Sequence, residues 1–220
     1  MFATIKPLLP RLLSYSLALV IMAFGISLSV ASDLGVSPVS SLPFAVSVVS
    51  GMSMGTMVTV FFVIYILFQI VFLRRDYKWI NLSQLLVSFV FGYLVDFANW
   101  IVWPRVMPVS YVTQLVTFVF SALFISFGLT LCVRAKIMVL PPEGVLLAIM
   151  ERRPSLPFSH VKMGFDITLV VFAAGITLIF LGRLEGVREG TVLAAVLIGR
   201  MVPVHTRVIE GVGRRFRRTP

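Results

Sequence analysis

The chain is 220 residues long, and 59% of its residues are hydrophobic while only 13% are charged. Soluble domains carry about 25% charged residues, so this composition excludes an ordinary soluble domain and predicts an integral membrane protein. The net charge of +10 comes from basic residues at the ends of apolar runs, where they meet lipid and set orientation. We therefore expect the lipid bilayer, and no nucleic acid, as a partner.

Six apolar stretches are long enough to cross a bilayer core, which needs about 20 residues of helix. They cover approximately residues 12–32, 54–73, 80–102, 111–133, 159–181 and 187–206. The first stretch superficially resembles a cleavable signal peptide, but its apolar run is too long for one. The sequence therefore predicts an all-α integral membrane protein with six transmembrane helices.

Two further apolar pieces, residues 37–50 and 141–150, are too short to cross a bilayer. Each follows a span and begins at or near a proline. Proline favours a helix start because its missing N–H group is not needed in the first turn. We expect these pieces to be short half-helices that enter the membrane without crossing it.

An internal repeat links the two half-helices and the spans before them. Residues 24–46 resemble residues 127–149 at a constant separation of 103 positions. The matched pairs are Phe24 with Phe127, Gly25 with Gly128, Leu28 with Leu131, Val30 with Val133, Pro38 with Pro141 and Ala45 with Ala148. A weaker match aligns residues 85–95 with 192–202. Chance alignment of apolar segments is the alternative, but the shared proline is independent support for a repeat.

A repeat unit with three spans would enter the membrane upside down in its second copy, as in many secondary transporters. We expect one membrane domain over residues 1–220, with repeat unit one at about 12–103 and repeat unit two at about 111–207. A basic tail at 208–220 completes the chain. In such inverted 3+3 repeats, the binding site often lies where interrupted segments of the two halves meet.

The distribution of basic residues predicts that both termini are cytoplasmic. This orientation leaves Arg105, Arg183 and Arg188 outside. It places these residues inside: Lys6, Arg11, Arg74, Arg75, Lys78, Arg134, Lys136, Arg152, Arg153, Arg207, Arg214, Arg215, Arg217 and Arg218.

Ionisable residues inside a membrane are energetically expensive and are candidates for ligand binding. Glu143 lies in the first turn of the second half-helix, where it either binds a ligand or complements the helix end. Lys162 and Asp166 are four residues apart and share a helix face. They form either part of a ligand site or a self-neutralising pair.

Further candidate binding residues are neutral or lie near span ends. Ser37, Ser40 and Ser41 begin the first half-helix and either bind a ligand or cap the helix. Asp96 and Asn99, three residues apart on the third span, either line a cavity or reach the outer interface.

The turn into the sixth span is the most distinctive piece of sequence. Glycines recur every four residues at Gly182, Gly186 and Gly190, a spacing that permits close backbone packing and is less often a binding motif. Glu189 and Thr191 open the helix that follows and complete the set of candidate binding residues.

Several motifs of catalysis and cofactor binding are absent from the sequence. It contains no phosphate-binding loop, zinc-protease motif, nucleophile elbow or dinucleotide fingerprint. Its single cysteine, Cys132, excludes an internal disulfide, and its histidines, His160 and His205, lack metal-ligand spacing. We expect no enzymatic activity, catalytic residue, metal site or cofactor.

Three stretches resemble the YczE- and YitT-type bacterial membrane proteins. They are GVREGTVLAAVLIG at 186–199, HVKMGFD at 160–166 and LGVSPVSSLP at 34–43, and the resemblance extends over nearly the whole chain. The cluster of Glu189, Gly190 and Thr191 is its most specific part. The resemblance implies a multi-pass protein of the bacterial inner membrane and assigns no substrate.

The leading functional hypothesis is a small secondary transporter or permease-like protein for a small-molecule or ion substrate. One alternative is a substrate-binding membrane subunit of an energised vitamin importer, which would copurify with an ATPase module. Another is a non-transporting membrane scaffold or sensor whose basic tail binds lipid or a partner. Whether the chain forms a homo-oligomer is left open.

The basic asymmetry makes a testable prediction about topology. In a background without Cys132, single cysteines at residues 77 and 213 should react only with reagent on the cytoplasmic side, whereas one at residue 106 should react only from outside. Membrane-impermeant maleimide on cells and on inverted vesicles measures this. Labelling of residue 213 from outside would contradict the even number of spans.

Overall fold

The computed structural model describes residues 8–216, with side chains described as far as residue 209. The described chain is helical, and six of its helices are long and apolar enough to cross a membrane. The six helices are α1 (Leu8–Ala31), α3 (Met54–Leu73), α4 (Gln84–Val102), α5 (Tyr111–Ala135), α7 (Phe158–Leu181) and α8 (Glu189–Phe216). The predicted all-α membrane fold is confirmed. Lys6 and residues 217–220 of the predicted tail lie outside the described residues.

Two short helices follow the first and fourth of these spans, as the prolines predict. α2 (Pro38–Ser50) and α6 (Pro141–Arg152) each have proline at the first helical position after an extended residue. α2 ends at Gly51, whose left-handed φ of 72° closes the last turn. Two 3-10 turns, η1 (Arg74–Asp76) and η2 (Trp79–Ser83), connect α3 to α4.

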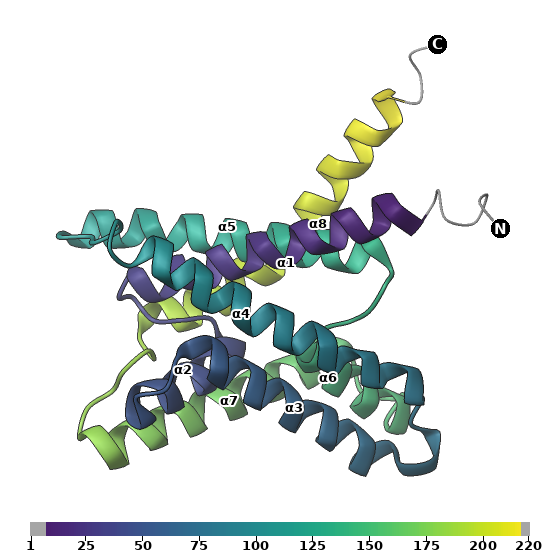
Figure 1. The fold of residues 1–220 in the computed structure, drawn as a ribbon, viewed down its shortest axis with the longest axis horizontal. Coiled ribbons are helices and arrows are strands. Elements are labelled where there is room, and N and C mark those ends of the chain that lie inside the picture. The colour runs from purple at the N-terminus through teal and green to yellow at the C-terminus, as the bar shows by residue number, and fades with distance from the viewer. Residues whose placement is uncertain (1–7, 217–220) are drawn as a thin grey trace.

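The helices form two layers, which Figure 1 shows from the side. α1 and α5 lie side by side in one layer, with α8 against α5. The other layer contains α2, α3, α6 and α7, in which α2 packs on α7 and α6 packs on α3. α4 joins the layers because it packs against both α1 and α3.

Glycines allow α1 and α5 to approach closely along their length. A Cβ atom at Gly25 would lie 2.8 Å from the Cγ1 of Ile125, and one at Gly128 would lie 2.9 Å from the carbonyl oxygen of Ala18 and also overlap Met22. Arg11 at the start of α1 donates to the carbonyl oxygen of Ala135 at the end of α5, at 2.8 Å. The two helices are therefore antiparallel.

The short helices lie head to head along α3. The C-terminus of α2 is at Gly51, just before α3 begins. The last turn of α6 reaches the opposite end of α3, where Arg152 donates to the carbonyl oxygen of Leu73 at 2.8 Å. Since α3 has 20 residues, these C-termini lie about 30 Å apart. The two N-termini therefore point toward the middle of the bundle.

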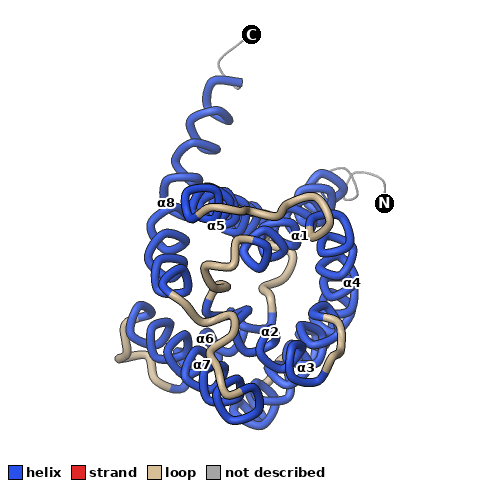
Figure 2. The backbone as a smooth tube through the Cα atoms, turned by 90° about the vertical axis from the view of Figure 1, so that its left-hand side faces the viewer, coloured by secondary structure: helices blue, strands red, loops and turns tan. Residues whose placement is uncertain are grey.

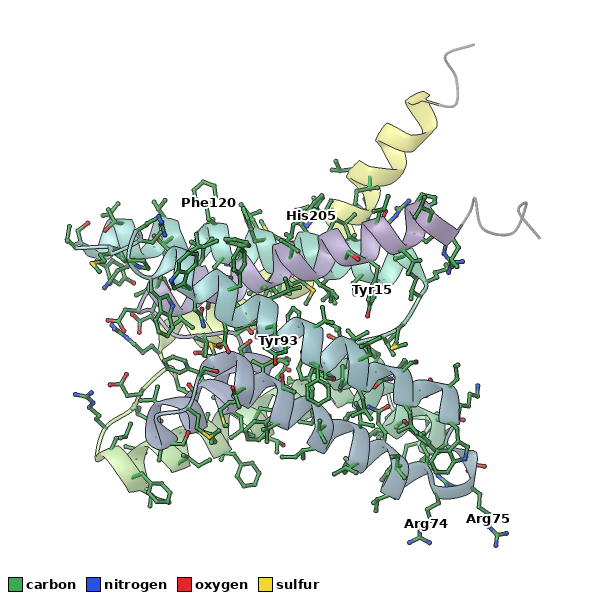
Figure 3. The ribbon with its side chains drawn as sticks, viewed as in Figure 1. Tyr15, Arg74, Arg75, Tyr93, Phe120 and His205 are labelled. Carbon is green, nitrogen blue, oxygen red and sulfur yellow. The ribbon has the colours of Figure 1, made fainter. Side chains whose placement is uncertain are left out.

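Basic residues gather at the end of the bundle where α3 and α5 terminate. Arg74 and Arg75 point outward from the end of α3 (Figure 3). Arg152 bridges to Asp76 at 3.0 Å on the same end. The last turns of α8, beyond the internal Pro203, turn away from the bundle (Figure 1).

The crossing of α3 and α4 predicts a strong steric effect. Gly55 packs so closely on α4 that a Cβ atom would overlap the carbonyl oxygen of Gly92, whereas a Cβ at Gly175 would meet nothing within 4 Å. Gly55→Ala should therefore lower the free energy of unfolding by about 1–3 kcal/mol. Gly175→Ala, the matched control, should raise it by about 0.5–1 kcal/mol. Reversible unfolding in mixed micelles measures both changes, and equal effects would show that the crossing is not tight.

Candidate functional site

A central cavity of about 360 Å³ lies between the two layers. All of the helices from α1 to α8 contribute to its wall. Most of the lining side chains are apolar, including Ile26, Phe62, Phe91 and Ile198. The helices enclose the centre of the bundle when it is seen along the spans (Figure 2). The few polar groups on this wall are therefore conspicuous.

The N-termini of both half-helices reach the cavity. Ser37, Pro38 and Ser40 line it from the start of α2, and Pro142 and Glu143 line it from the start of α6. Helix N-termini carry free N–H groups and a partial positive charge. The cavity thus has two positive helix ends, contributed by segments that are remote in the sequence.

Glu143 is a charged residue in the first turn of α6 that faces this cavity. It lines the cavity, and its Oε2 atom is buried with no hydrogen-bond partner among the described residues. Its strongest electrostatic interaction with another side chain is with Lys162, followed by Asp166. The carboxylate also interacts with the N–H group of its own residue. The buried Oε2 atom, which has no such partner, is costly unless it is protonated or meets a cation.

Lys162 and Asp166 line the same cavity from α7. The Nζ atom of Lys162 donates to both carboxylate oxygens of Asp166, at 2.5 and 2.7 Å. The Asp166 side chain is mostly buried, and the Lys162 side chain is partly exposed. The pair therefore neutralises itself, as one of the two sequence interpretations has it, and it also faces Glu143.

The three serines of α2 divide into two groups. Ser37 and Ser40 line the cavity, and the Ser37 hydroxyl donates to the Ser40 hydroxyl at 3.1 Å. Ser41 is fully buried and its hydroxyl donates to the carbonyl oxygen of Pro38 at 2.7 Å, within its own helix. Ser37 and Ser40 are thus available to a ligand, while Ser41 is occupied by the backbone.

Asp96 and Asn99 do not line the central cavity. Asp96 accepts hydrogen bonds from the Ser53 hydroxyl at 2.6 Å and from the Gly55 N–H at 2.7 Å, so it caps the N-terminus of α3. Asn99 is buried on α4, and its Oδ1 atom has no hydrogen-bond partner among the described residues. The geometry gives Asp96 a helix-capping contact at one end of the bundle.

Glu189 and Thr191 also lie outside the cavity, in a contact between α8 and the loop that leads into α2. Glu189 is exposed beside Arg188. Thr191 is buried, and its Oγ1 atom donates to the carbonyl oxygen of Gly186 at 3.3 Å. A Cβ atom on Gly35 of the loop would lie 2.6 Å from that Oγ1 atom. This conspicuous motif therefore packs against the loop before α2.

Two backbone hydrogen bonds complete that contact. The Val36 N–H donates to the carbonyl oxygen of Gly186 at 2.9 Å, and the Gly190 N–H donates to the carbonyl oxygen of Leu34 at 2.8 Å. A Cβ atom at Gly190 would approach the Leu34 oxygen to 2.5 Å. Small residues are needed here because two backbone segments touch.

Two tyrosines belong to the polar surroundings of the cavity although the sequence did not single them out. Tyr15 on α1 points toward the second layer (Figure 3), and its hydroxyl lies within electrostatic range of Glu143. The hydroxyl of Tyr65 on α3 lies within electrostatic range of Asp166. The Tyr65 hydroxyl is buried without a hydrogen-bond partner among the described residues, and the buried Tyr15 hydroxyl interacts with the Cys132 thiol. No sequence spacing connects these tyrosines with acids on other helices.

The cavity is open between α7 and α8. These helices do not pack against each other along their lengths, although both line the cavity. The lining residues Phe158, Ala195 and Gly199 are exposed there. A Cβ atom on Gly199 would meet nothing within 4 Å. Since α7 and α8 are both long enough to span the membrane, this opening faces sideways.

The described residues contain no group of three or more histidine, cysteine or acidic side chains that could hold a metal ion. Glu143 and Asp166 are two carboxylates that face one cavity, and Asp166 is already paired with Lys162. The arrangement is suited to binding a charged or hydrogen-bonding group in an apolar enclosure.

Comparison with known proteins identifies relatives over nearly the whole length. The model of a family of unknown function, DUF6198, matches residues 9–207. An uncharacterised membrane protein, YczE of Bacillus subtilis, is 26% identical over 186 residues, which cover 84% of this chain and 80% of that protein. No solved structure matches the chain. The resemblance to YczE-type membrane proteins is confirmed.

The contact between Lys162 and Asp166 predicts strong coupling between their substitutions. Lys162→Met leaves the mostly buried Asp166 without its partner, and Asp166→Asn leaves Lys162 without its own. A double-mutant cycle on the free energy of unfolding should give a coupling energy of about 0.5–3 kcal/mol. The corresponding cycle between Lys162→Met and Glu151→Gln, at the end of α6, should give none. Purely additive effects of the first pair of substitutions would show that Lys162 and Asp166 do not form an ion pair in the folded protein.

Proposed function

The chain belongs to the DUF6198 family, and we propose that it is a small secondary transporter or permease-like protein of the bacterial inner membrane. The observation that carries the proposal is the meeting of two half-helix N-termini in one cavity with Glu143, Lys162 and Asp166. In secondary transporters, interrupted helices commonly form the substrate site near the bilayer midplane. The cavity then binds a small molecule or ion.

An inverted repeat is the second part of the proposal. α2 begins at Pro38 and α6 at Pro141, 103 residues later. α3 begins at Met54 and α7 at Phe158, 104 residues later. α4 begins at Gln84 and α8 at Glu189, 105 residues later. This regular correspondence supports two units of equal build, at about 12–103 and 111–207.

Contacts between α1 and α5 support a two-fold relation between the units. Gly25 packs on Ile125, and Gly128 packs on Met22. Adding 103 to 22 and 25 gives 125 and 128, so the two contacts exchange when the units exchange. Because the helices are antiparallel, the axis relating them would lie in the membrane plane, as an inverted topology requires.

The packing of the other helices largely follows the same exchange, although α2 packs on α8 and the corresponding helices α6 and α4 have no comparable contact. α1 packs on α4 as α5 packs on α8, and α2 packs on α7 as α6 packs on α3. α3 packs closely on α4, whereas the corresponding α7 and α8 are separated. In an alternating-access cycle, the open and closed arrangements would change places between the two units. The structure would then be one of two related states.

The predicted orientation remains part of the proposal. The basic cluster at one end of the bundle, with Arg74, Arg75 and Arg152, would face the cytoplasm. α2 would then return to the outer side and α6 to the inner side. The cavity, at the junction of their N-termini, would lie near the bilayer midplane.

A screen with a cavity-filled variant tests the proposal. Purified protein should be stabilised against heat by a subset of a metabolite library, because a ligand that binds only the folded state raises its stability. Gly199→Phe should abolish this effect by filling the cavity, since its side chain enters open space on the wall. Gly164→Phe is the matched control, because Gly164 has open space but does not line the cavity.

Flux separates a transporter from the other two functional classes. The stabilising compound should enter liposomes containing only this protein, down its gradient, and Gly199→Phe should block entry. Binding without flux, together with copurification of an ATPase module, would favour the vitamin-importer subunit instead. Absence of any stabilising compound would contradict a ligand-binding cavity and favour a scaffold or sensor.

A further inference from the structure

We propose that the cavity binds an organic monocation with an apolar body, that Glu143 is its counter-ion, and that the cation exchanges for a proton on this carboxyl group. This inference rests on the proposed function and specifies its substrate class and coupling ion. It is carried by three observations, namely the charge balance of the cavity wall, the unpartnered atom of Glu143, and the apolar character of the remaining wall.

Among the charged side chains on the wall, one negative charge has no side-chain partner. The charged side chains are Glu143, Lys162 and Asp166. Lys162 and Asp166 neutralise each other through two short hydrogen bonds, at 2.5 and 2.7 Å. Glu143 makes no ion pair within 4 Å among the described residues. The two helix ends add only partial positive charges from backbone N–H groups, so a positively charged ligand supplies the full counter-charge that no side chain gives Glu143.

The position of Glu143 distinguishes this role from that of a helix-end residue alone. A carboxylate that only complements the α6 dipole would keep its oxygens on N–H groups of the first turn or in water. The Glu143 carboxylate does interact with the N–H group of its own residue in the first turn of α6, but its Oε2 atom is buried without a hydrogen-bond partner in the described chain, and the residue faces the cavity. That atom is free to accept a proton or to contact a cation.

The rest of the wall selects a ligand with an apolar body. Ile26, Phe62, Phe91, Leu129 and Ile198 surround the polar groups. A small hydrated metal ion would lose its water against such a wall with a single free carboxylate as replacement. A cationic group on an apolar body instead gains burial of its carbon surface. The opening also lies between α7 and α8, two helices that are long and apolar enough to span the membrane.

The pH dependence follows from the groups that face Glu143. These are Lys162 and Asp166 on α7, Tyr15 on α1 and Cys132 on α5. An organic cation binds the ionised form of Glu143, whereas a proton neutralises it. Cation affinity should therefore fall as the pH is lowered through the titration of Glu143, and cation binding should release a proton. No covalent bond changes, and charge balances as one cation replaces one proton.

Matched probes test the charge preference directly. Benzyltrimethylammonium carries a permanent positive charge, so its own ionisation does not change with pH. Neopentylbenzene is its neutral carbon isostere, and benzylsulfonate is an anion of similar size. Calorimetric titration of the purified full-length protein should show about tenfold or greater preference for the cation over the neutral isostere. Repeating the titration in buffers of different ionisation enthalpy measures the released proton.

Variants on α6 assign the preference to one carboxylate. Glu143→Gln should reduce cation affinity to that of the neutral isostere and abolish proton release, while Glu143→Asp should retain the preference. Glu151→Gln removes an exposed carboxylate from the other end of the same helix and should change neither quantity. Gly199→Phe should weaken binding of both the cation and its isostere, which places them in the cavity.

Three results would overturn the inference. They are equal affinity for the cation and its isostere, tighter binding of the sulfonate, or an unchanged cation preference in Glu143→Gln. If one of these results is found and Gly199→Phe still abolishes binding of the probe, the cavity binds a ligand of another class. The proposed transport function would then be retained. Absence of binding by every probe would also overturn the cation inference, whereas the metabolite screen and liposome flux decide the proposed function independently.

Discussion

Irregular backbone inside an apolar bundle must find its hydrogen-bond partners within the protein, and the loop that leads into α2 depends on this constraint. It is met by backbone pairing with the segment that opens α8, through Val36 with Gly186 and Leu34 with Gly190. Side chains from the end of α1 contribute, because the Ser29 hydroxyl donates to the carbonyl oxygen of Gly35 at 3.2 Å. This pairing ties the start of α2 to the last span, and hence sets one wall of the cavity.

The two halves of the bundle differ in how firmly they are closed. Between α3 and α4, the backbones touch at Gly55 and Gly92, and Asp96 adds a cap. Between α7 and α8 there is no comparable packing, and Gly199 faces open space. Under the proposed inverted repeat, two units in different packing states would provide a means of opening a central site to one side at a time. The tight half would hold the cavity closed while the loose half admits a ligand.

Periodicity and prolines predicted most of the architecture but only part of the site. Pro38 and Pro141 marked the half-helices correctly, because proline placement is a local property of the chain. The approach of Glu143 to α7 depends on how distant helices pack, which local spacing does not encode. For the same reason the sequence did not single out Tyr15, which lies near Glu143. The sequence also left open whether Asp96 lines a cavity, and in the structure Asp96 on α4 caps the N-terminus of α3.

The head-to-head half-helices give the protein a charge profile that runs against its composition. The chain has nineteen basic and nine acidic residues, yet the charged groups on the cavity wall are two acids and one lysine. Each half-helix directs a partial positive charge at the same place, and the Glu143 carboxylate adds a full negative charge there. The potential along the bundle would therefore be strongly positive at the basic end and much lower at its middle. A cation that approaches from the basic end would be repelled, whereas entry through the opening between α7 and α8 avoids that end.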